Sequence, residues 1–342
     1  MKWGLIMISK YIEYYKKNNI LTINQDAKTS KGTKKGYLTA ILYLSPFKLS
    51  GKNLCAFATP GCIATCLNIA GRGKFTAIQK ARLKRSLFYL NHKQAFMVNL
   101  INRIQNFIKL AENKGLIPVV RLNGTSDIPF ENIRIKADYD LLKQGVIKLL
   151  DDTRIGAYYN IMQLFPGIQF YDYTKYPLNK RNKSNLNNYD LTFSLAENNW
   201  NDAKYYLDNK AGRVSAVFSH NVPKTYKGYK VVNGDKTDLR FLEPKGVIVG
   251  LKFKGTIVDR IKGINSGFVI YNDNKQVNND TNILIEIIKD NYIKADELRK
   301  VTYQYKTDFN QLVIKTVDIN TDLNDYELKQ HLIDLIPTYH CK

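Results

Sequence analysis

Three of the four cysteines lie close together in the chain, and this clustering points to metal chemistry. Cys55, Cys62 and Cys66 follow the pattern Cys-x6-Cys-x3-Cys in a polar loop. Cysteine thiolates bind zinc and iron–sulfur clusters. A structural zinc site needs four ligands, so the fourth would be Cys341, His340 or a distant residue. A four-iron four-sulfur cluster held by three thiolates would instead leave one iron open for a small molecule. Both interpretations stay open.

Polar segments follow three predicted strands, at residues 123–127, 172–175 and 194–198. The carboxyl ends of parallel strands are where α/β barrels build their active sites. The alternative for any single segment is that its polar side chains cap the next helix, because Ser, Thr, Asp and Asn are the preferred capping residues. Three such ends in one chain favour a site.

Four residues are candidates for catalysis: Asp127, Asp172, Lys175 and Asp238. Asp127 could act as a general base or bind a ribose hydroxyl, while Asp172 and Lys175 end another strand among tyrosines. Asp238 lies near Asp235, and the two carboxylates could bind a divalent cation or act as an acid/base pair. The alternative for this pair is a turn capped by Asp235.

Basic and aromatic residues indicate contacts with nucleic acid. Glycines around Arg72 open a long predicted helix, where backbone N–H groups favour an anion. The residues predicted to contact phosphates are Arg72, Lys74, Lys80, Arg82, Lys84 and Arg85. Those predicted to meet unpaired bases are Tyr173, Lys180 and Arg181. The alternatives are a solvated helix face and tyrosines that pack at the rim of the fold.

The elements that must position these residues alternate between strand and helix. Short apolar runs predict strands at residues 36–44, 117–123, 167–173, 189–194, 212–219 and 247–253. Helical spacing predicts helices at 75–114 (with a break at 91–92), 160–165, 199–209 and 295–300. Alternation of this kind predicts an α/β fold with a parallel sheet. With about six such units, we expect a parallel (βα) barrel or partial barrel, with a small C-terminal α+β appendage.

The charge is unevenly distributed along the 342 residues. The chain carries a net charge of +22, but residues 263–342 hold 9 basic and 12 acidic side chains, so residues 1–262 carry +25. We therefore expect an N-terminal extension (1–23), a basic barrel-like core (24–262) and an acidic accessory region (263–342). The basic core predicts a polyanionic partner such as DNA or RNA, although an AT-rich genome would also enrich lysine. No apolar run is long enough to span a membrane, and the N-terminus is a poor secretory signal.

Several long segments resemble a known family. They are residues 36–72, 121–129, 170–175, 191–194 and 234–252, which include Thr-Pro-Gly-Cys-Ile-Ala-Thr-Cys and Arg-Leu-Asn-Gly-Thr-Ser-Asp. In this order they resemble the uncharacterised bacteriophage "gene product 88" family over about residues 24–270. The resemblance implies a phage origin or a phage-derived element, and we expect the protein to act in the cytoplasm of the infected bacterial host.

The cysteine loop, placed just after the first predicted barrel strand, also resembles that of radical S-adenosylmethionine enzymes. Their usual spacing is Cys-x3-Cys-x2-Cys, from which this chain departs. The resemblance implies a four-iron four-sulfur cluster on Cys55, Cys62 and Cys66, with S-adenosylmethionine as its partner. Asn123, Gly124 and Ser126 would then contact the cofactor's amino end.

Three functions follow from these observations. The first is a phage enzyme with a cysteine-bound iron–sulfur site that modifies DNA, RNA or a nucleotide-derived substrate. The second is a cluster-free barrel enzyme that exchanges bases in nucleic acid, with Asp127 or Asp172 as nucleophile. The third is a zinc-stabilised nucleic-acid-binding protein without enzymatic activity.

Overall fold

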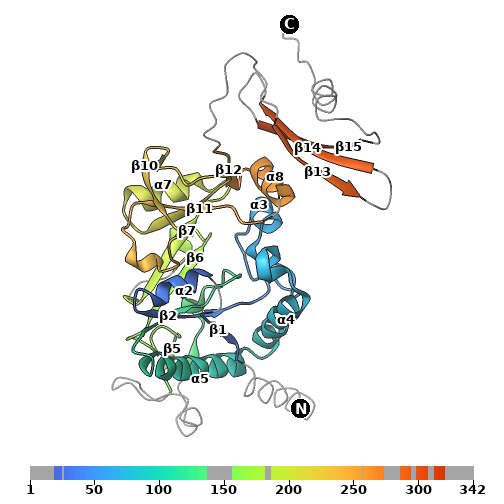
Figure 1. Ribbon diagram of the computed structural model, residues 1–342. Helices are drawn as coiled ribbons and strands as arrows, with labels where there is room; N and C mark the ends of the chain where they lie inside the picture. The colour runs from blue at the N-terminus through green and yellow to red at the C-terminus, as the bar shows by residue number, and fades with distance from the viewer. Residues whose placement is uncertain are drawn as a thin grey trace.

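The computed structural model describes residues 19–24, 27–136, 156–181, 186–255, 257–272, 286–293, 298–306 and 312–319 (Figure 1). Cys341, His340 and most of the predicted N-terminal extension lie outside these residues. Within the described part of the chain, no helix is long and apolar enough to cross a membrane.

A ten-stranded sheet forms the centre of the protein. Its strands are β1 (Leu21–Ile23), β2 (Tyr37–Leu42), β3 (Ile117–Arg121), β6 (Gln169–Thr174), β7 (Tyr189–Ser194), β8 (Arg213–Phe218), β9 (Thr225–Tyr226), β10 (Tyr229–Asn233), β11 (Ile248–Lys252) and β12 (Val269–Ile270). The spatial order is β1-β2-β3-β6-β7-β8-β11-β10-β9, and β12 pairs with β8. All six predicted strands are present, each with ends within two residues of the expected ones.

The middle of the sheet is parallel and its edges are mixed. β2, β3, β6, β7, β8 and β11 follow one another in space as they do in sequence, and each pairs in parallel with the next. At one edge β1 runs antiparallel to β2. At the other edge β10 is parallel to β11, while β9 is antiparallel to β10. The carboxyl ends of the six parallel strands therefore meet along one side of the sheet, as expected.

The helices are α2 (Ala27–Thr33), α3 (Pro60–Ala64), α4 (Thr76–Asn91), α5 (Lys93–Glu112), α7 (Trp200–Asp208) and α8 (Ile257–Ser266). Short 3-10 turns add η1 (Leu67–Ile69), η2 (Gly71–Lys74), η3 (Phe130–Asn132), η4 (Leu178–Lys180) and η5 (Arg240–Leu242). The break predicted at residues 91–92 is confirmed, because α4 ends at Asn91 and α5 begins at Lys93. The short helix predicted at 160–165 is instead a series of turns.

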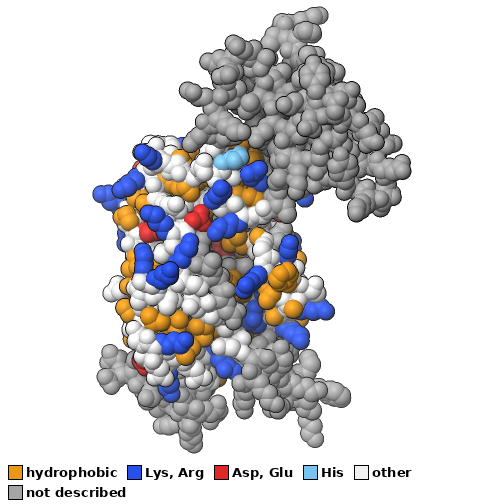
Figure 2. All heavy atoms as spheres, viewed as in Figure 1, with side chains coloured by type: hydrophobic (Ala, Val, Ile, Leu, Met, Phe, Trp, Pro, Cys, Tyr) orange, Lys and Arg blue, Asp and Glu red, His pale blue; other side chains and the backbone are white. Residues whose placement is uncertain are grey.

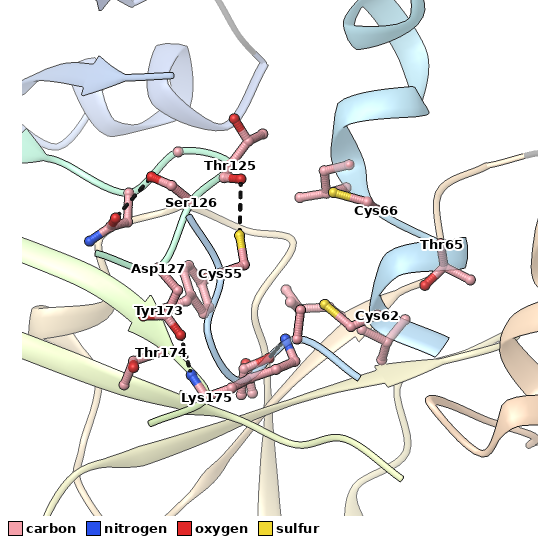
Figure 3. A pocket seen from close by; sticks show the side chains of 18 of the residues that line it. Cys55, Cys62, Thr65, Cys66, Thr125, Ser126, Asp127, Tyr173, Thr174 and Lys175 are labelled. Carbon is pink, nitrogen blue, oxygen red and sulfur yellow. Dashed lines mark hydrogen bonds between the residues drawn. The ribbon is translucent and has the colours of Figure 1, made fainter. Parts of the chain in front are cut away.

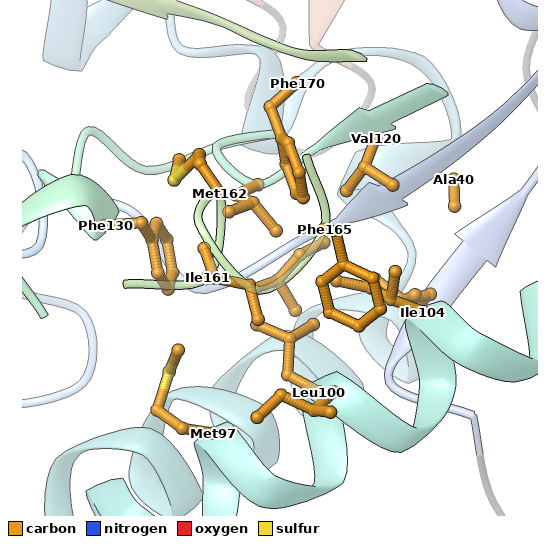
Figure 4. Packing of buried hydrophobic residues seen from close by; sticks show 14 of the residues in the cluster. Ala40, Met97, Leu100, Ile104, Val120, Phe130, Ile161, Met162, Phe165 and Phe170 are labelled. Carbon is orange, nitrogen blue, oxygen red and sulfur yellow. The ribbon is translucent and has the colours of Figure 1, made fainter. Parts of the chain in front are cut away.

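α5 closes the largest hydrophobic core. Its buried residues recur every three or four positions, so one face packs against the sheet. Figure 4 shows Leu100 and Ile104 of α5 beneath Val120 of β3 and Phe170 of β6, with Phe165 between them. These side chains are completely or almost completely buried. This core fixes the parallel strands whose ends carry the site.

The barrel expectation is wrong. A barrel needs a sheet that closes on itself, whereas β1 and β9 are the two ends of this strand order. The helices do not follow a βα repeat either: among the described residues, β8 reaches β11 through the β9–β10 hairpin and η5, with no helix. The fold is a mixed, mostly parallel ten-stranded sheet. The order of the apolar runs predicts which strands are parallel neighbours. Whether the sheet closes into a barrel depends on pairing between its two edge strands, which local sequence patterns do not predict.

Two small sheets complete the description. β4 (Ile135–Lys136) and β5 (Tyr158–Tyr159) pair as a short ribbon. β13 (Glu286–Ile293), β14 (Leu298–Lys306) and β15 (Leu312–Ile319) form a separate antiparallel sheet. β14 begins inside the segment predicted as a helix at 295–300. α8 runs across the predicted boundary at residue 262, and the division into three regions stays a prediction.

Candidate functional site

A cavity of about 410 Å³ lies at the carboxyl ends of the parallel strands. Each of these strands, or the segment just after it, contributes side chains to the wall: Tyr43, Arg121, Tyr173, Ser194, Ser215 and Lys252 follow the strand order from β2 to β11. The cysteine loop and the segment after β3 complete the wall (Figure 3). The sheet therefore curves around this space without closing.

All three clustered cysteines line the cavity. Cys62 lies in α3 and Cys66 just after it, on one side of the view in Figure 3, with Ser126 and Asp127 on the other side and Cys55 between them. The three thiols are close together in the sequence, and in the structure they line the same cavity. Within the described part of the chain, no three His, Cys, Asp or Glu side chains converge closely enough to hold a metal ion in their present positions.

Cys55 is tied to the segment after β3. Its Sγ accepts a hydrogen bond from Phe47 N at 3.4 Å and donates to the Thr125 carbonyl oxygen at 3.7 Å. Cys55 also forms an isolated β-bridge with Asp127. Burial raises the pKa of the Cys55 thiol to about 12, so the thiol is protonated at neutral pH.

Cys62 and Cys66 are placed by the ends of short helical turns. Thr59 caps α3, and its Oγ1 accepts a hydrogen bond from Cys62 N at 3.4 Å. Cys66 precedes η1, and its Sγ accepts from Asn68 N at 3.5 Å. Burial raises the pKa of Cys66. A cation in the cavity would oppose these burial effects and favour the thiolates.

Lys175 joins the cysteine side of the cavity to the acidic side. Its Nζ donates to Ser194 Oγ at 3.0 Å, and its backbone N donates to Asp127 Oδ2 at 2.8 Å. Burial alone would lower the pKa of the ammonium group, but the neighbouring Cys62 and Asp127 outweigh it and raise this pKa. Lys175 is therefore a charged group inside the cavity.

Asp127 belongs to a buried ionic cluster. Arg181 Nη1 lies 3.2 Å from Asp127 Oδ1, and the Arg181 guanidinium also donates to both carboxylate oxygens of Glu131. Burial raises the pKa of Asp127, although Arg181 and the Lys175 backbone N–H oppose that shift. Arg181, predicted to contact nucleic acid, is buried in this cluster and is not accessible to a partner.

Asp172 does not reach the cavity. Successive side chains of a strand point to opposite faces, so Tyr173 faces the cavity while Asp172 faces the other way. Asp172 is buried, and it accepts hydrogen bonds from Asn123 N at 2.7 Å and from Tyr189 Oη at 3.0 Å. Burial raises the pKa of Asp172 to about 6. In this position it orders the segment that begins at Asn123.

The three residues predicted to bind a cofactor do line the cavity. Ser126 Oγ donates to Asn123 Oδ1 at 2.9 Å, and Asn123 Nδ2 donates to the Ile128 carbonyl oxygen at 3.0 Å. Gly124 lies so close to Tyr43 that a Cβ on it would be 2.5 Å from Tyr43 Cδ1. The segment is therefore a tight, internally bonded turn.

Asp238 lies on the cavity wall, paired with Arg121. Arg121 Nη1 donates to Asp238 Oδ2 at 2.9 Å, and the Arg121 guanidinium lies 4.7 Å from the centre of the Tyr173 ring. Asp235 does not share this site, since its carboxylate accepts from Lys252 N and pairs with Lys254. The sequence interpretation missed Arg121, although it lies at the end of a predicted strand.

The predicted phosphate contacts divide into exposed and buried residues. The exposed ones are Arg72, Lys74, Lys80 and Lys84, and Lys180, predicted to meet unpaired bases, is exposed as well. Arg85 is half-buried, and its Nε donates to the Tyr43 carbonyl oxygen at 2.8 Å. Arg82 is buried, with its guanidinium bonded to Asn68 Oδ1 at 2.5 Å and lying over the Tyr43 ring. Arg82 supports the cavity wall and does not reach solvent.

Comparison with known proteins identifies the family. The gene product 88 family matches residues 16–272. The chain belongs to this bacteriophage family. The match covers the sheet and every residue of the cavity wall, and it extends the resemblance seen at residues 24–270 by a few residues at each end. No curated protein and no solved structure matches the chain.

Proposed function

We propose that this gene product 88 protein is an enzyme that holds an iron–sulfur cluster on Cys55, Cys62 and Cys66 and acts on nucleic acid or a nucleotide-derived substrate in the host cytoplasm. The observation that supports it is the shared cavity: the three cysteines and the turn predicted to bind the cofactor line the same space. A four-iron four-sulfur cluster with three thiolates supplies electrons and one iron open to a small molecule. S-adenosylmethionine is the proposed small molecule.

A cluster and a single zinc ion place different demands on the thiols. Zinc needs four ligands at about 2.0–2.3 Å. The three cysteines share one wall but do not converge to such distances within the described residues. A cluster of several atoms spans more widely separated sulfurs than one ion does. Zinc as a structural ion remains an outcome that the experiment below distinguishes.

Residues of this chain would hold and orient the bound molecules. Lys175 brings a positive charge beside Cys62, which favours an anionic group at the centre of the cavity. The Asn123–Ser126 turn offers polar groups held in place by its own hydrogen bonds. The cluster-free alternative receives less support, because Asp172 points away from the cavity and Asp127 is bound to Arg181.

A basic surface beside the cavity supports nucleic acid as the partner. Residues 27–111 contain fifteen Lys and Arg and no Asp or Glu. Leu67, Phe75 and Ile78 are exposed here, close in sequence to exposed Arg72 and Lys74, and Leu67 also lines the cavity. Figure 2 shows basic side chains across the described face, with few acidic ones. Aromatic and aliphatic groups among cations suit a strand with unstacked bases.

Metal analysis tests the cluster. The full chain is purified without oxygen, and its absorption spectrum, iron, sulfide and zinc are measured. We expect about four irons and four sulfides per chain and a brown colour. Cys55→Ser, Cys62→Ser or Cys66→Ser should each lose the iron, the sulfide and the colour. A colourless protein with stoichiometric zinc, or with no metal, contradicts the proposal. Because burial raises the pKa of Cys55 and Cys66, metal uptake should increase with pH.

Salt dependence of binding tests the partner. A labelled single-stranded oligonucleotide is titrated at 50–200 mM salt with the wild type and with the triple variant Arg72→Ala, Lys74→Ala, Lys80→Ala. The matched control replaces three exposed lysines near the other edge of the sheet, Lys224, Lys230 and Lys245. We expect the first variant alone to weaken binding and to reduce the salt slope by about two, because each lost phosphate contact removes roughly 0.7 for a single strand. Equal effects of both triple variants contradict a specific surface.

A further inference from the structure

Arg121 has an incomplete set of hydrogen bonds at the cavity wall. It ends β3, and its Nη1 donates to Asp238 Oδ2 at 2.9 Å. Its Nε is buried and has no hydrogen-bond partner among the described residues. A buried N–H without an acceptor is costly, and the Arg121 side chain lines the cavity, so an acceptor supplied by a bound molecule would offset this cost.

The guanidinium group is held in a fixed orientation. Its Cζ lies 4.7 Å from the Tyr173 ring centre. The Asp238 carboxylate, which fixes Nη1, also accepts hydrogen bonds from Tyr171 Oη and Tyr173 Oη at 3.5 Å. Burial works against the charged form, but Asp238 outweighs it and raises the pKa of Arg121. Arg121 is therefore a permanent, oriented cation, and Asp238 is a positioning residue.

We propose that the Nε–Nη2 edge of Arg121 binds an oxyanion, a phosphate or a carboxylate, of the molecule that occupies the cavity. Asp238 accepts the hydrogen bond from Nη1. The remaining edge of the guanidinium is the one on which the Nε and Nη2 N–H bonds lie side by side. Two parallel N–H donors match two oxygens of one anion. The inference deepens the proposed function and rests on it only for the statement that the bound molecule is the substrate or its cofactor.

The charges of the cavity wall support an anionic ligand. Its two carboxylates are already paired, Asp127 with Arg181 at 3.2 Å and Asp238 with Arg121 at 2.9 Å. Lys175 and Lys252 also line the cavity. An added anion therefore meets positive charge that the wall's own carboxylates do not neutralise.

Calorimetric titration of the full chain tests this inference. The probes are AMP and adenosine, which differ only by the phosphate, with inorganic phosphate and acetate as competitors. We expect AMP to bind at least ten-fold more tightly than adenosine. Competition by phosphate assigns the site to phosphates, and competition by acetate assigns it to carboxylates. Equal affinity for AMP and adenosine, or no binding of AMP, phosphate or acetate by the folded wild type, overturns the inference.

Variants connect the binding to Arg121. Arg121→Lys keeps the charge but loses the paired donors, so we expect AMP affinity to fall at least ten-fold and adenosine affinity to stay unchanged. Lys252→Ala should weaken AMP several-fold, and exposed Lys230→Ala, which lies outside the cavity, is the matched control. If Arg121→Lys does not fold, the Lys252 comparison and the competition experiment decide. Unchanged AMP affinity in folded Arg121→Lys overturns the inference.

The same samples separate this inference from the proposed function. Arg121 is not a cluster ligand, so Arg121→Lys should keep the iron and sulfide of the wild type. If the wild type holds no iron but binds AMP, and Arg121→Lys weakens that binding, the cluster is contradicted and the anion site is not. If the wild type holds iron but Arg121→Lys binds AMP as tightly as the wild type does, the anion site is contradicted and the cluster is not.

Discussion

Glu197 holds Gly61 against the segment that follows β7: Glu197 Oε1 accepts a hydrogen bond from Gly61 N at 2.7 Å, and its Oε2 accepts one from Thr59 Oγ1 at 2.6 Å. Gly61 directly precedes Cys62, so this carboxylate fixes the cysteine loop from 136 residues away in sequence. Hydrogen bonds to a charged group are stronger than neutral ones. The position of the thiols thus depends on a residue outside their loop.

We expect Glu197→Ala to loosen the cysteine loop. The loss of two charge-assisted hydrogen bonds should lower the free energy of unfolding by about 2 kcal/mol, as measured by urea denaturation. Iron retained after anaerobic purification should also fall. Glu112→Ala, at an exposed carboxylate at the end of α5, is the control and should change neither quantity. Wild-type iron content and stability in Glu197→Ala would contradict the role of Glu197.

Gly124→Ala should disturb the cavity wall. A Cβ here would lie 2.5 Å from Tyr43 Cδ1 and 2.7 Å from Ile41 Cγ2, so the ring or the turn must move. Overpacking of this kind costs about 1–3 kcal/mol. Gly167→Ala is the matched control, because nothing lies within 4 Å of its added Cβ. Thermal denaturation compares the unfolding midpoints of the two variants, and Gly124→Ala should have the lower midpoint. Equal midpoints would show that the turn at Gly124 is not tightly packed.

Arg181→Met should be among the most destabilising changes near the site. It leaves the buried carboxylates of Glu131 and Asp127 without their cation. Removing one partner of a buried ion pair costs about 3–5 kcal/mol. The same replacement at Lys204, whose ion pair with Asp208 is exposed, should have no measurable effect on the unfolding curve. A small loss for Arg181→Met would mean that water or protonation relieves the cluster.

Asp172 should make stability depend on pH in the acid range. Burial raises its pKa from 3.8 to about 6, so the folded state favours the protonated form. The stabilisation is complete below pH 3.8 and is lost as the pH rises through 6. Relative to Asp172→Asn, which cannot ionise, the wild type should lose about 3 kcal/mol over this range. Urea unfolding of both proteins between pH 4 and 7 measures the difference, and a constant difference would exclude the shift.

Sequence patterns alone determine the local elements of this protein. The apolar runs predict all six parallel strands, and helical spacing with the break at residues 91–92 predicts α4 and α5. The clustering of Cys55, Cys62 and Cys66 predicts one site. These features are local, because a strand or helix buries one face and the order of apolar residues records that face.

Only the tertiary structure decides which of the predicted residues meet. Asp172 and Tyr173 are neighbours in sequence, yet the two-residue period of β6 sends them to opposite faces. Arg82 and Arg181 look like surface cations in the sequence, but both are buried against partners. Arg121 pairs with Asp238 across 117 residues, and the sheet stays open because its edge strands do not pair. Each of these outcomes depends on long-range burial and hydrogen bonding, which local periodicity does not encode.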